Sequence, residues 1–308
     1  MKRVLCAGEI NVDLILQDHS AFPVLGKEVL VQDSQLVLGS ATAIMAMGLA
    51  RLGTPVAFVG RVGDDVWGRY CLEAMAGRDI DLSRVIRGGA LKTGVTVSIT
   101  HPGDRALVTY LGAISALTGA DVPDAAMAGL DHLHVSSFFL QEGLRPHLAE
   151  LFARAHRAGL TTSLDTGFDP SGRWDGGLRE TLRETDLLFP NEVELAALTG
   201  SEDPAEGLRR LGGGRTRVVA KLGKDGAAAL DGGEVVRVPA YPVEAVDTTG
   251  AGDSFNAGFL HRWLAAAPLV ECLRLGAACG ALSTRGLGGT ASQPTLEEAE
   301  ALMRQHGR

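Results

Sequence analysis

Short apolar runs that alternate with helical patterns limit the fold of this 308-residue chain more than any other feature. Six runs have the length and composition of β-strands: residues 4–7, 56–59, 132–135, 161–164, 187–189 and 218–222. Between them lie segments with helical spacing. Residues 145–158, for example, place their apolar side chains on one face, and Gly159 follows as a stop. Strands that alternate with helices predict a mostly parallel sheet with helices on both faces.

Two stretches in the N-terminal third interrupt this alternation. Residues 28–38 are strand-like and no helix follows them. Residues 96–100 and 106–110 flank the turn-forming sequence His-Pro-Gly-Asp at 101–104, which predicts a hairpin. We interpret both stretches as a small β appendage that covers one edge or mouth of the main domain. The alternative interpretation is an ordinary meander within the main sheet.

Charge and composition restrict the partners and the location of the chain. The formal net charge is −8 and no block of Lys and Arg occurs, whereas a nucleic-acid-binding surface usually has a basic patch. No transmembrane stretch is present, and Glu9 and Asp13 come too early for the apolar core of a signal peptide. The four cysteines form no CxxC pair, which favours buried free thiols. We therefore expect a cytoplasmic protein that binds neither nucleic acid nor membrane.

A glycine-rich turn near the C-terminus carries the strongest chemical signal. Residues 246–258 read VDTTGAGDSFNAG, and aromatic residues at helical spacing begin at the end of this segment. The free N–H groups and the dipole of a helix N-terminus attract anions. Gly250 and Gly252 have no Cβ atom, so the backbone there can approach a phosphate closely. The segment is therefore a candidate anion-binding turn.

Asp253 lies in the same turn, where a phosphate would repel its carboxylate. One reason for its presence is that it accepts the proton of an attacking hydroxyl during phosphoryl transfer, while the N–H groups of the turn neutralise developing charge. The alternative is a plain helix N-cap. The chain has no GxxxxGK[ST] string and no GxGxxG that opens a helix after an early strand, so neither a P-loop nor a dinucleotide fold is favoured.

Six motifs occur in the order found in one enzyme family. Residues 247–255, DTTGAGDSF, resemble the C-terminal signature of the ribokinase-like, PfkB-type carbohydrate kinases. Five other segments are similar to the same family: residues 8–13, residues 39–40 with the helix through 49–53, residues 59–68, the NxxE sequence at 191–194, and residues 221–226. Because the motifs cover most of the chain in the right order, the chain is identified as a member of this family.

The resemblance implies a fold and an activity. The fold is α/β, with a doubly wound, mostly parallel sheet and a small β-sheet lid, which agrees with the β appendage inferred above. A single domain would span residues 1–308, with the lid formed by insertions at about 14–38 and 93–112. The implied activity is ATP-dependent phosphorylation of a hydroxyl group of a small sugar or sugar-like substrate.

The resemblance also implies roles for particular residues. Asp253 would be the catalytic base, and Gly250, Ala251 and Gly252 would form the anion hole. Asn11, Asp13, Gly39 and Ser40 would bind or border the substrate hydroxyls; the alternative for Asp13 is a turn or cap residue. A helix over 269–284, which is rich in small residues, would border the adenine, and tight helix packing is the other explanation of its composition.

The implied cofactors are ATP and Mg²⁺, with K⁺ as a candidate monovalent cation. The nucleotide and its phosphates are assigned to Asn191, Glu194, Lys221, Gly223 and Gly226. Glu194 would also hold Mg²⁺ through water, because Mg²⁺ keeps several waters. Asp247 and Thr249 occupy the positions that match the monovalent cation site. The alternatives are a surface helix face for Glu194 and a solvated strand-end position for Lys221.

Several positions depart from the pattern of the family. Ser40 replaces the second Gly of a Gly-Gly pair, and Ile44 stands where many members carry an Asn that helps to bind a sugar hydroxyl. An alkyl group in place of an amide removes a donor and an acceptor, so the substrate is expected to bind differently on that side. Arg105 in the predicted turn leaves a phosphorylated sugar open, with a solvated arginine as the alternative. Gly167 replaces a frequent Asn in the loop at 165–170, to which no chemistry is assigned.

Two other functions stay open at this point. One is a nucleoside kinase on the same fold, because Ile44 and apolar lid residues leave room for a base. The other is a catalytically idle sugar-binding protein, against which Asp253 and the two glycines of the turn argue. Members of the family often dimerise through the lid, which makes a homodimer the candidate assembly.

Overall fold

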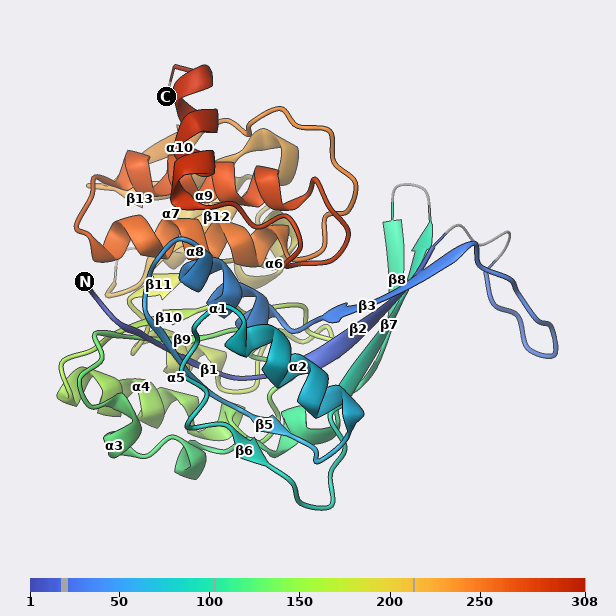
Figure 1. Cartoon of the computed structure of the whole chain (residues 1–308). Helices are drawn as coiled ribbons and strands as arrows, with labels where there is room; N and C mark the ends of the chain where they lie inside the picture. Colours follow the sequence, from blue (N-terminus) through green and yellow to red (C-terminus); the bar gives the residue numbers. More distant parts are fainter. Residues whose placement is uncertain (18–21, 102–103, 213, 308) are drawn as a thin grey trace.

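A mostly parallel sheet of eight strands forms the centre of the computed structural model, which describes residues 1–17, 22–101, 104–212 and 214–307 (Figure 1). Across the sheet the order is β14 (Glu234–Val238), β13 (Ala227–Asp231), β12 (Arg217–Lys221), β11 (Leu187–Leu188), β10 (Thr161–Leu164), β9 (His132–Val135), β1 (Val4–Ala7) and β4 (Val56–Val59). The strands from β12 to β4 pair in parallel, and β13 and β14 join in antiparallel pairing. The predicted sheet is confirmed.

The ends of the predicted elements are confirmed in part. β1, β4, β9 and β10 begin and end at the predicted residues, whereas β11 ends at Leu188 and β12 spans Arg217–Lys221. β11 pairs with its neighbours only through Leu187 and Leu188, so the third predicted residue lies outside the ladder. The helix predicted over 145–158 is α4 (Leu148–Arg157), preceded by a 3₁₀ turn, η3 (Arg145–His147), that contains Pro146.

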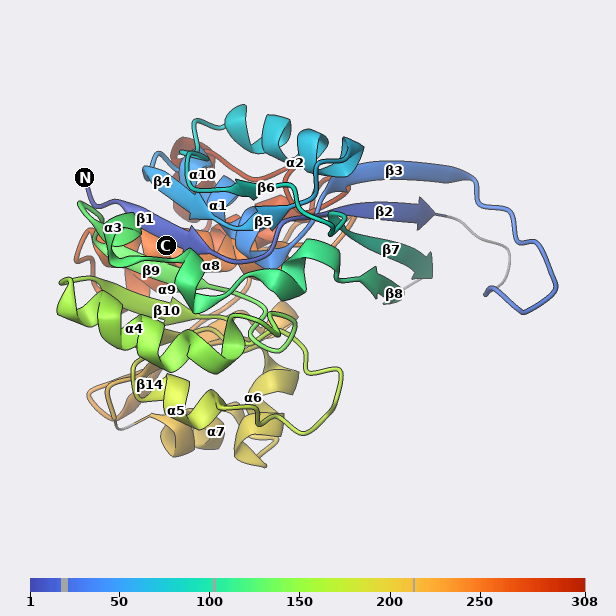
Figure 2. The same cartoon turned by 90° about the horizontal axis from the view of Figure 1, so that it is seen from below.

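Helices cover both faces of the sheet, as Figure 2 shows from below. One face carries α1 (Ala41–Arg51), α2 (Val66–Ala76), α8 (Ala251–Leu264), α9 (Leu269–Ser283) and α10 (Leu296–Gln305). The other carries α3 (Asp124–Met127), α4, α5 (Leu178–Leu182), α6 (Glu192–Thr199) and α7 (Pro204–Leu211). Three further 3₁₀ turns are η1 (Gly112–Ala116), η2 (Gly119–Asp121) and η4 (Gly223–Asp225).

Side-chain alternation along the strands divides the core in two. In β1, Val4 and Cys6 pack with α1, α8 and α9, whereas Leu5 and Ala7 pack with α4 on the opposite side. A strand that is buried on both faces reads as a continuous apolar run, which is why these strands were recognisable in the sequence. All four cysteines are buried free thiols, as predicted.

A second sheet of four strands projects from the body beside α2 (Figures 1 and 2). Its order is β3 (Asp33–Leu38), β2 (Asn11–Gln17), β7 (Gly94–His101) and β8 (Asp104–Tyr110). A short pair, β5 (Arg61–Val62) and β6 (Ile86–Arg87), lies apart from it. The predicted hairpin and the separate small β-sheet are therefore confirmed, and the alternative of a meander in the main sheet is wrong.

The strand predicted over 28–38 is too long. Only Asp33–Leu38 forms β3, in which Asp33 pairs with Gln17 of β2, and residues 28–32 lie outside this strand. The centre of the predicted turn, residues 102–103, and the side chain of Arg105 lie outside the described part of the chain.

The strand order reverses at β1, because the chain passes from β1 to β4 on one side and then to β9 on the other. In open α/β sheets, ligands bind beyond the carboxyl ends of the strands at such a reversal. The loops after β1 and β9 are therefore the place to look for a site. Among the helices of the described residues, none combines the length and the apolar character needed to cross a bilayer.

Candidate active site

A first cavity of about 220 Å³ lies between the four-stranded sheet, the carboxyl ends of β1 and β9, and the start of α8. Its lining comes from segments far apart in the sequence: Glu9, Asn11, Asp13, Ile15, Ser40, Ala41, Ile44, Thr96, Ser98, Leu107, Thr109, Ile114, Ser137, Leu140, Thr249, Gly250 and Asp253. The predicted substrate residues Asn11, Asp13 and Ser40 therefore share one cavity with the predicted base Asp253.

Asn11 is the centre of the polar network in the first cavity. Its Oδ1 accepts a hydrogen bond from Ser40 Oγ at 2.7 Å, and its Nδ2 donates to Thr96 Oγ1 at 2.9 Å and to Asp13 Oδ1 at 3.2 Å. Gly39 does not line the cavity but lies against this network, since a Cβ at residue 39 would overlap the Asp13 carboxylate. Gly39 therefore leaves Asp13 room to face the cavity.

The backbone conformation at Ser40 explains why glycine is usual at this position of the family motif. Its φ is +70°, in the left-handed region where a side chain costs about 1–3 kcal/mol and a glycine is at ease. The hydrogen bond from Ser40 Oγ to Asn11 offsets part of this strain. The departure noted in the sequence thus trades backbone strain for an additional hydroxyl in the cavity.

Glu9 is a cavity residue that the sequence analysis did not assign. It lies two residues after the end of β1, is 3% exposed, and accepts hydrogen bonds from Thr42 N at 3.2 Å and Thr42 Oγ1 at 2.7 Å. Burial raises the pKa of the Glu9 carboxyl, and the hydrogen bonds from Thr42 oppose the shift. Its place at the carboxyl end of the first strand was the signal that could have identified it.

The glycine-rich turn does lead directly into a helix. Gly250 is the N-cap of α8 with a φ of +70°, and a Cβ there would lie 2.7 Å from Gly289 Cα. The N–H of Ala251 donates to Thr248 O at 3.2 Å. Gly252 and Asp253 lie in the first turn of the helix, where backbone N–H groups have no acceptor within the helix. Because Gly250 is the cap, the interpretation of Asp253 as an N-cap is wrong.

Asp253 is partly buried and has several charged neighbours. Burial raises the pKa of its carboxyl well above the ordinary value, the charge of Asp165 raises it further, and Lys221 opposes both effects. A carboxyl with a raised pKa is a stronger proton acceptor once it is ionised. The group at the wall of the first cavity is thus suited to take a proton from a bound hydroxyl.

A second cavity of about 410 Å³ lies on the other side of the same turn. Its lining is more apolar: Lys221, Gly223, Lys224, Gly226, Ala240, Tyr241, Val243, Ala245, Thr248, Ala251, Gly252, Phe255, Ala277, Gly280, Ala281 and Thr284. The predicted nucleotide residues Lys221, Gly223 and Gly226 are all among them. Small residues of α9 also line it, as the resemblance implied. The turn from Thr248 to Asp253 is the wall between the two cavities.

Lys221 is held in a buried ion pair at this wall. Its Nζ lies 2.6 Å from Asp165 Oδ2, and the side chains are 13% and 6% exposed. Asn256, one turn after Asp253 in α8, donates to the same oxygen at 2.6 Å. Burial alone would lower the pKa of Lys221, but Asp165 and Glu194 raise it. The interpretation of Lys221 as a solvated strand-end lysine is wrong, and Asp165, to which no chemistry was assigned, holds it in place.

Asn191 and Glu194 line neither of these cavities. They form a capping box at the start of α6, in which Glu194 N donates to Asn191 Oδ1 at 2.8 Å and Asn191 N donates to Glu194 Oε2 at 2.9 Å. Asn191 also forms an isolated parallel bridge with Lys221. Glu194 is 5% exposed, so its interpretation as part of a surface helix face is wrong. Burial, with the charge of Asp165 second, raises the pKa of Glu194 to about 7.

Glu194 should therefore make stability depend on pH. Its folded pKa of about 7 exceeds the unfolded value of about 4.3, so between these values the folded state holds the proton more tightly and rising pH lowers the free energy of unfolding. We expect Glu194→Gln to lose this pH dependence, whose slope in the unmodified protein is at most about 1.4 kcal/mol per pH unit. Urea unfolding in metal-free buffer at several pH values measures it.

The exposed Glu192 of the same helix supplies the control for that measurement. Glu192→Gln should leave the pH dependence of unfolding as it is in the unmodified protein. The stability of Glu194→Gln relative to the unmodified protein should rise as pH increases towards about 7 and then level off. A constant difference across this range would contradict the assignment of a raised pKa to Glu194.

Asp247 and Thr249 lie together at the start of the turn. Asp247 Oδ1 accepts hydrogen bonds from Thr249 N at 2.9 Å and Thr249 Oγ1 at 2.8 Å, and Asp247 Oδ2 accepts from Gly288 N at 2.8 Å. The segment after α9 is thereby tied to the turn. In the described part of the chain, no three His, Cys, Asp or Glu side chains gather as ligands for a metal ion.

Comparison with known proteins agrees with this arrangement. Residues 1–296 match the pfkB family of carbohydrate kinases. The chain belongs to this family. It is 35% identical to an ATP-dependent ribose-1-phosphate kinase of Halopiger xanaduensis, with 98% of each chain covered. It is 36% identical to a fructokinase of Klebsiella pneumoniae, over 85% of this chain and 90% of the relative.

Solved structures share the fold of this carbohydrate kinase. A fructokinase of Vibrio cholerae O395, in a form with bound fructose, ADP and potassium ion, has a TM-score of 0.81 at 26% identity, with 98% of both chains covered. A ribokinase-like protein of E. coli in complex with ATP and Mg²⁺ has a TM-score of 0.83 at 24% identity, with 99% of this chain and 100% of the other covered. The predicted family, the predicted fold and the enzyme class of an ATP-dependent carbohydrate kinase are confirmed.

Proposed function

We propose that the enzyme transfers the γ-phosphoryl group of ATP to a hydroxyl of a small sugar or sugar-like molecule bound in the first cavity. One observation carries this proposal: Asp253 lines the first cavity, and its neighbours Ala251 and Gly252 line the second. A sugar hydroxyl on one side and a terminal phosphate on the other would thus meet across a single helical turn. The first cavity also contains the carboxylates of Glu9 and Asp13, which accept strong hydrogen bonds from hydroxyl groups.

The proposed reaction uses the groups of the turn in one displacement. Asp253 takes the proton of the attacking hydroxyl, and the hydroxyl oxygen forms a bond to the γ-phosphorus as the bond to the β,γ-bridging oxygen breaks. ADP leaves with the electron pair of that bond. The N–H groups of Gly252 and Asp253, with the dipole of α8, stabilise the negative charge on the phosphoryl oxygens, and the Ala251 N–H joins them if it releases Thr248.

We place the nucleotide in the second cavity, with Lys221, Gly223 and Gly226 around it and Asn191 and Glu194 behind Lys221. A buried carboxylate with a pKa of about 7 fits the water shell of Mg²⁺, which favours oxygen ligands. When bound, Mg²⁺ neutralises charge on the phosphates.

The Asp247 carboxylate beside Thr249 fits a monovalent cation such as K⁺, because it adds negative charge close to the turn.

We further propose a single domain over residues 1–308, with the insertions at about 14–38 and 93–112 as the lid, and a cytoplasmic location.

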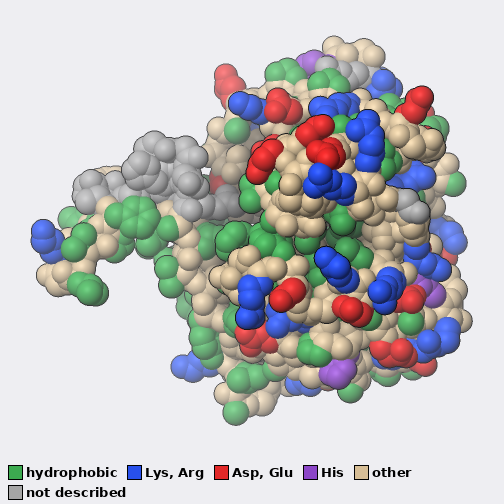
Figure 3. Space-filling model, turned by 180° about the vertical axis from the view of Figure 1, so that it is seen from behind, with side chains coloured by type: hydrophobic (Ala, Val, Ile, Leu, Met, Phe, Trp, Pro, Cys, Tyr) green, Lys and Arg blue, Asp and Glu red, His purple; other side chains and the backbone are tan. Residues whose placement is uncertain are grey.

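We also propose a homodimer through the lid, because β8 exposes Leu107, Val108 and Tyr110. The arm over residues 22–32 projects from the body with apolar side chains exposed (Figure 3). A second lid would remove these side chains from water.

A substrate panel tests the proposed function. Release of ADP is measured with pentoses, ketohexoses, sugar phosphates and nucleosides, and the product of each active substrate is identified by mass analysis. We expect turnover with at least one sugar or sugar phosphate, and a product that carries one added phosphoryl group. Turnover with nucleosides alone would replace the proposal by a nucleoside kinase. Sugar binding without transfer to any acceptor would leave an idle sugar-binding protein.

A further inference from the structure

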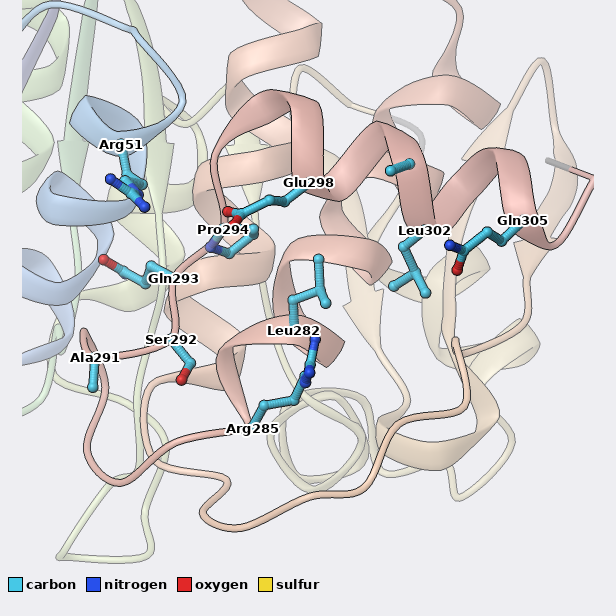
Figure 4. Close-up of a pocket in the computed structure, with 11 residues that line it drawn as sticks. Arg51, Leu282, Arg285, Ala291, Ser292, Gln293, Pro294, Glu298, Leu302 and Gln305 are labelled. Carbon is cyan, nitrogen blue, oxygen red and sulfur yellow. The ribbon is translucent and has the colours of Figure 1, made fainter.

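A third cavity, of about 480 Å³, lies outside the two already described. It is enclosed by the end of α1, the segment that follows α9, and α10 (Figure 4). Its apolar lining includes Leu282, Pro294 and Leu302, and its polar lining includes Ser292 and Gln305. None of these residues takes part in the proposed reaction, so the cavity has no role in the active site itself.

Two arginines without an ion-pair partner reach into this cavity. Arg51 extends from α1 and Arg285 from the segment after α9 (Figure 4), and neither forms an ion pair with a described residue. Glu298 is the acidic residue of the lining, but its Oε2 accepts hydrogen bonds from Thr295 N at 2.7 Å and Thr295 Oγ1 at 3.0 Å in a capping box. These hydrogen bonds lower the pKa of Glu298, and the charges of the two arginines add to the effect. One carboxylate thus faces two guanidinium groups, and the cavity holds more positive than negative charge.

A third arginine lies outside the lining of the cavity but close enough to Arg51 to feel its charge. Arg78 follows α2 and donates from Nη2 to Thr290 O at 3.4 Å, while its Nη1 is buried without a hydrogen-bond partner among the described residues. Burial lowers the pKa of Arg78, and the nearby charge of Arg51 lowers it further. Like charges at short distance repel unless an anion lies between or beside them. The arrangement thus favours occupation by a ligand with negative charge.

The chemistry of the lining specifies the class of ligand. Guanidinium groups bind phosphoryl oxygens through charge-assisted, often bidentate hydrogen bonds. The Ser292 hydroxyl is a further donor in the lining. Leu282, Pro294 and Leu302 offer an apolar wall that a bare phosphate ion would leave unused. A phosphoryl group with an organic part attached uses both sides of the cavity.

The segment behind the third cavity also supports the catalytic turn. Gly288, three residues after Arg285, donates from its N–H to Asp247 Oδ2 at 2.8 Å. Gly289 packs so closely on Gly250 that a Cβ on residue 250 would lie 2.7 Å from Gly289 Cα. A ligand that shifts or stiffens residues 285–294 therefore acts on the turn that carries Asp253.

We propose that the third cavity is a regulatory site for a phosphate monoester, whose phosphoryl group lies between the exposed Arg51 and Arg285, on opposite sides of the cavity, and whose organic part packs on the apolar wall. Binding there is coupled to substrate binding through the segment from Arg285 to Pro294. By linkage, substrate in the active site changes the affinity of the third cavity for its ligand by the same factor.

Calorimetric titration with phenyl phosphate tests the site. The enzyme is first saturated with Mg²⁺ and ADP, so that the second cavity is already occupied. We expect a dissociation constant of about 1 mM or tighter, and weaker binding of inorganic phosphate, which lacks the organic part. Because the arginines are exposed, binding should weaken as ionic strength rises. No binding up to about 10 mM, or equal binding of both probes, would overturn the proposal.

The double variant Arg51→Gln with Arg285→Gln identifies the cavity. It should bind phenyl phosphate at least about tenfold more weakly, with unchanged thermal stability and unchanged basal turnover. Arg179→Gln, an exposed arginine of α5 on the opposite face of the sheet, serves as the control and should bind normally. Equal binding by the double variant and the control would place the ligand elsewhere and refute the assignment.

A kinetic measurement tests the coupling. Phenyl phosphate should change the KM for the accepted sugar by about fivefold or more in the unmodified enzyme and leave it unchanged in the double variant. Binding that depends on the arginines but leaves KM unaffected would overturn the regulatory role. The calorimetry does not depend on turnover, so a failure of the proposed function and a failure of this site give different results.

Discussion

Asp253→Asn is expected to lower turnover by about 10³-fold or more while leaving nucleotide binding intact, because the amide cannot accept the proton of the attacking hydroxyl. Asparagine has nearly the same size as aspartate, and Asp253 lies in the first turn of α8, so we expect the helix and its N–H groups to stay in place. The carboxyl pKa is already raised by burial, so its neutral replacement adds no uncompensated charge. Steady-state kinetics with the accepted sugar, and titration with ADP, measure the two properties.

Asp64→Asn is a suitable control for that experiment, since the side chain of Asp64 is 85% exposed and forms a surface ion pair with Arg69 at 3.6 Å. It should leave turnover within about twofold of the unmodified enzyme. If Asp253→Asn retained normal turnover, the wall between the two cavities would not contain the base, and the proposed mechanism would be wrong. If it lost ADP binding as well, a disturbed turn rather than a missing base would explain the result.

Regular periodicity made the frame of the fold predictable from the sequence. β1, β4, β9 and β10 are buried on both faces, so they read as uninterrupted apolar runs with definite ends. The end of β3 was not predictable in the same way. Whether a residue joins β3 depends on the backbone groups that the partner strand presents to it, and that is a property of pairing between segments rather than of residues 28–32 themselves.

The candidate site was predictable where its residues lie within one motif. Gly250, Ala251, Gly252 and Asp253 are consecutive, so the sequence alone indicated a turn with a carboxylate at a helix start. Asp165 is 56 positions from Lys221, and their ion pair arises because β10, β11 and β12 are adjacent in the sheet. A single sequence carries no record of strand order, so this contact could not be inferred.

The ion pair between Lys221 and Asp165 leads to the second large effect. We expect Lys221→Met to lower the free energy of unfolding by about 3–5 kcal/mol, because it leaves the Asp165 carboxylate buried without its counter-ion. Methionine fills most of the volume of the lysine side chain, so little of the loss comes from packing. Denaturant unfolding at neutral pH measures the change. Lys224→Met, an exposed lysine beside the same cavity, is the control and should cost less than about 0.5 kcal/mol.

The double variant Lys221→Met with Asp165→Asn separates charge from packing. The introduced amide would keep an oxygen for the Asn256 side chain, which donates to Asp165 Oδ2 at 2.6 Å, and would bring no charge that needs Lys221. It would lose the second oxygen, which accepts from Gly167 N at 3.0 Å, so recovery should be partial. If the unpaired carboxylate is what destabilises Lys221→Met, then removing that carboxylate should recover at least half of the loss in the free energy of unfolding. Two independent core substitutions would instead give a double variant that loses the sum of the two single losses. Losses that add would mean that Lys221 contributes through its contacts alone, and that its ion pair with Asp165 does not stabilise the wall beside Asp253.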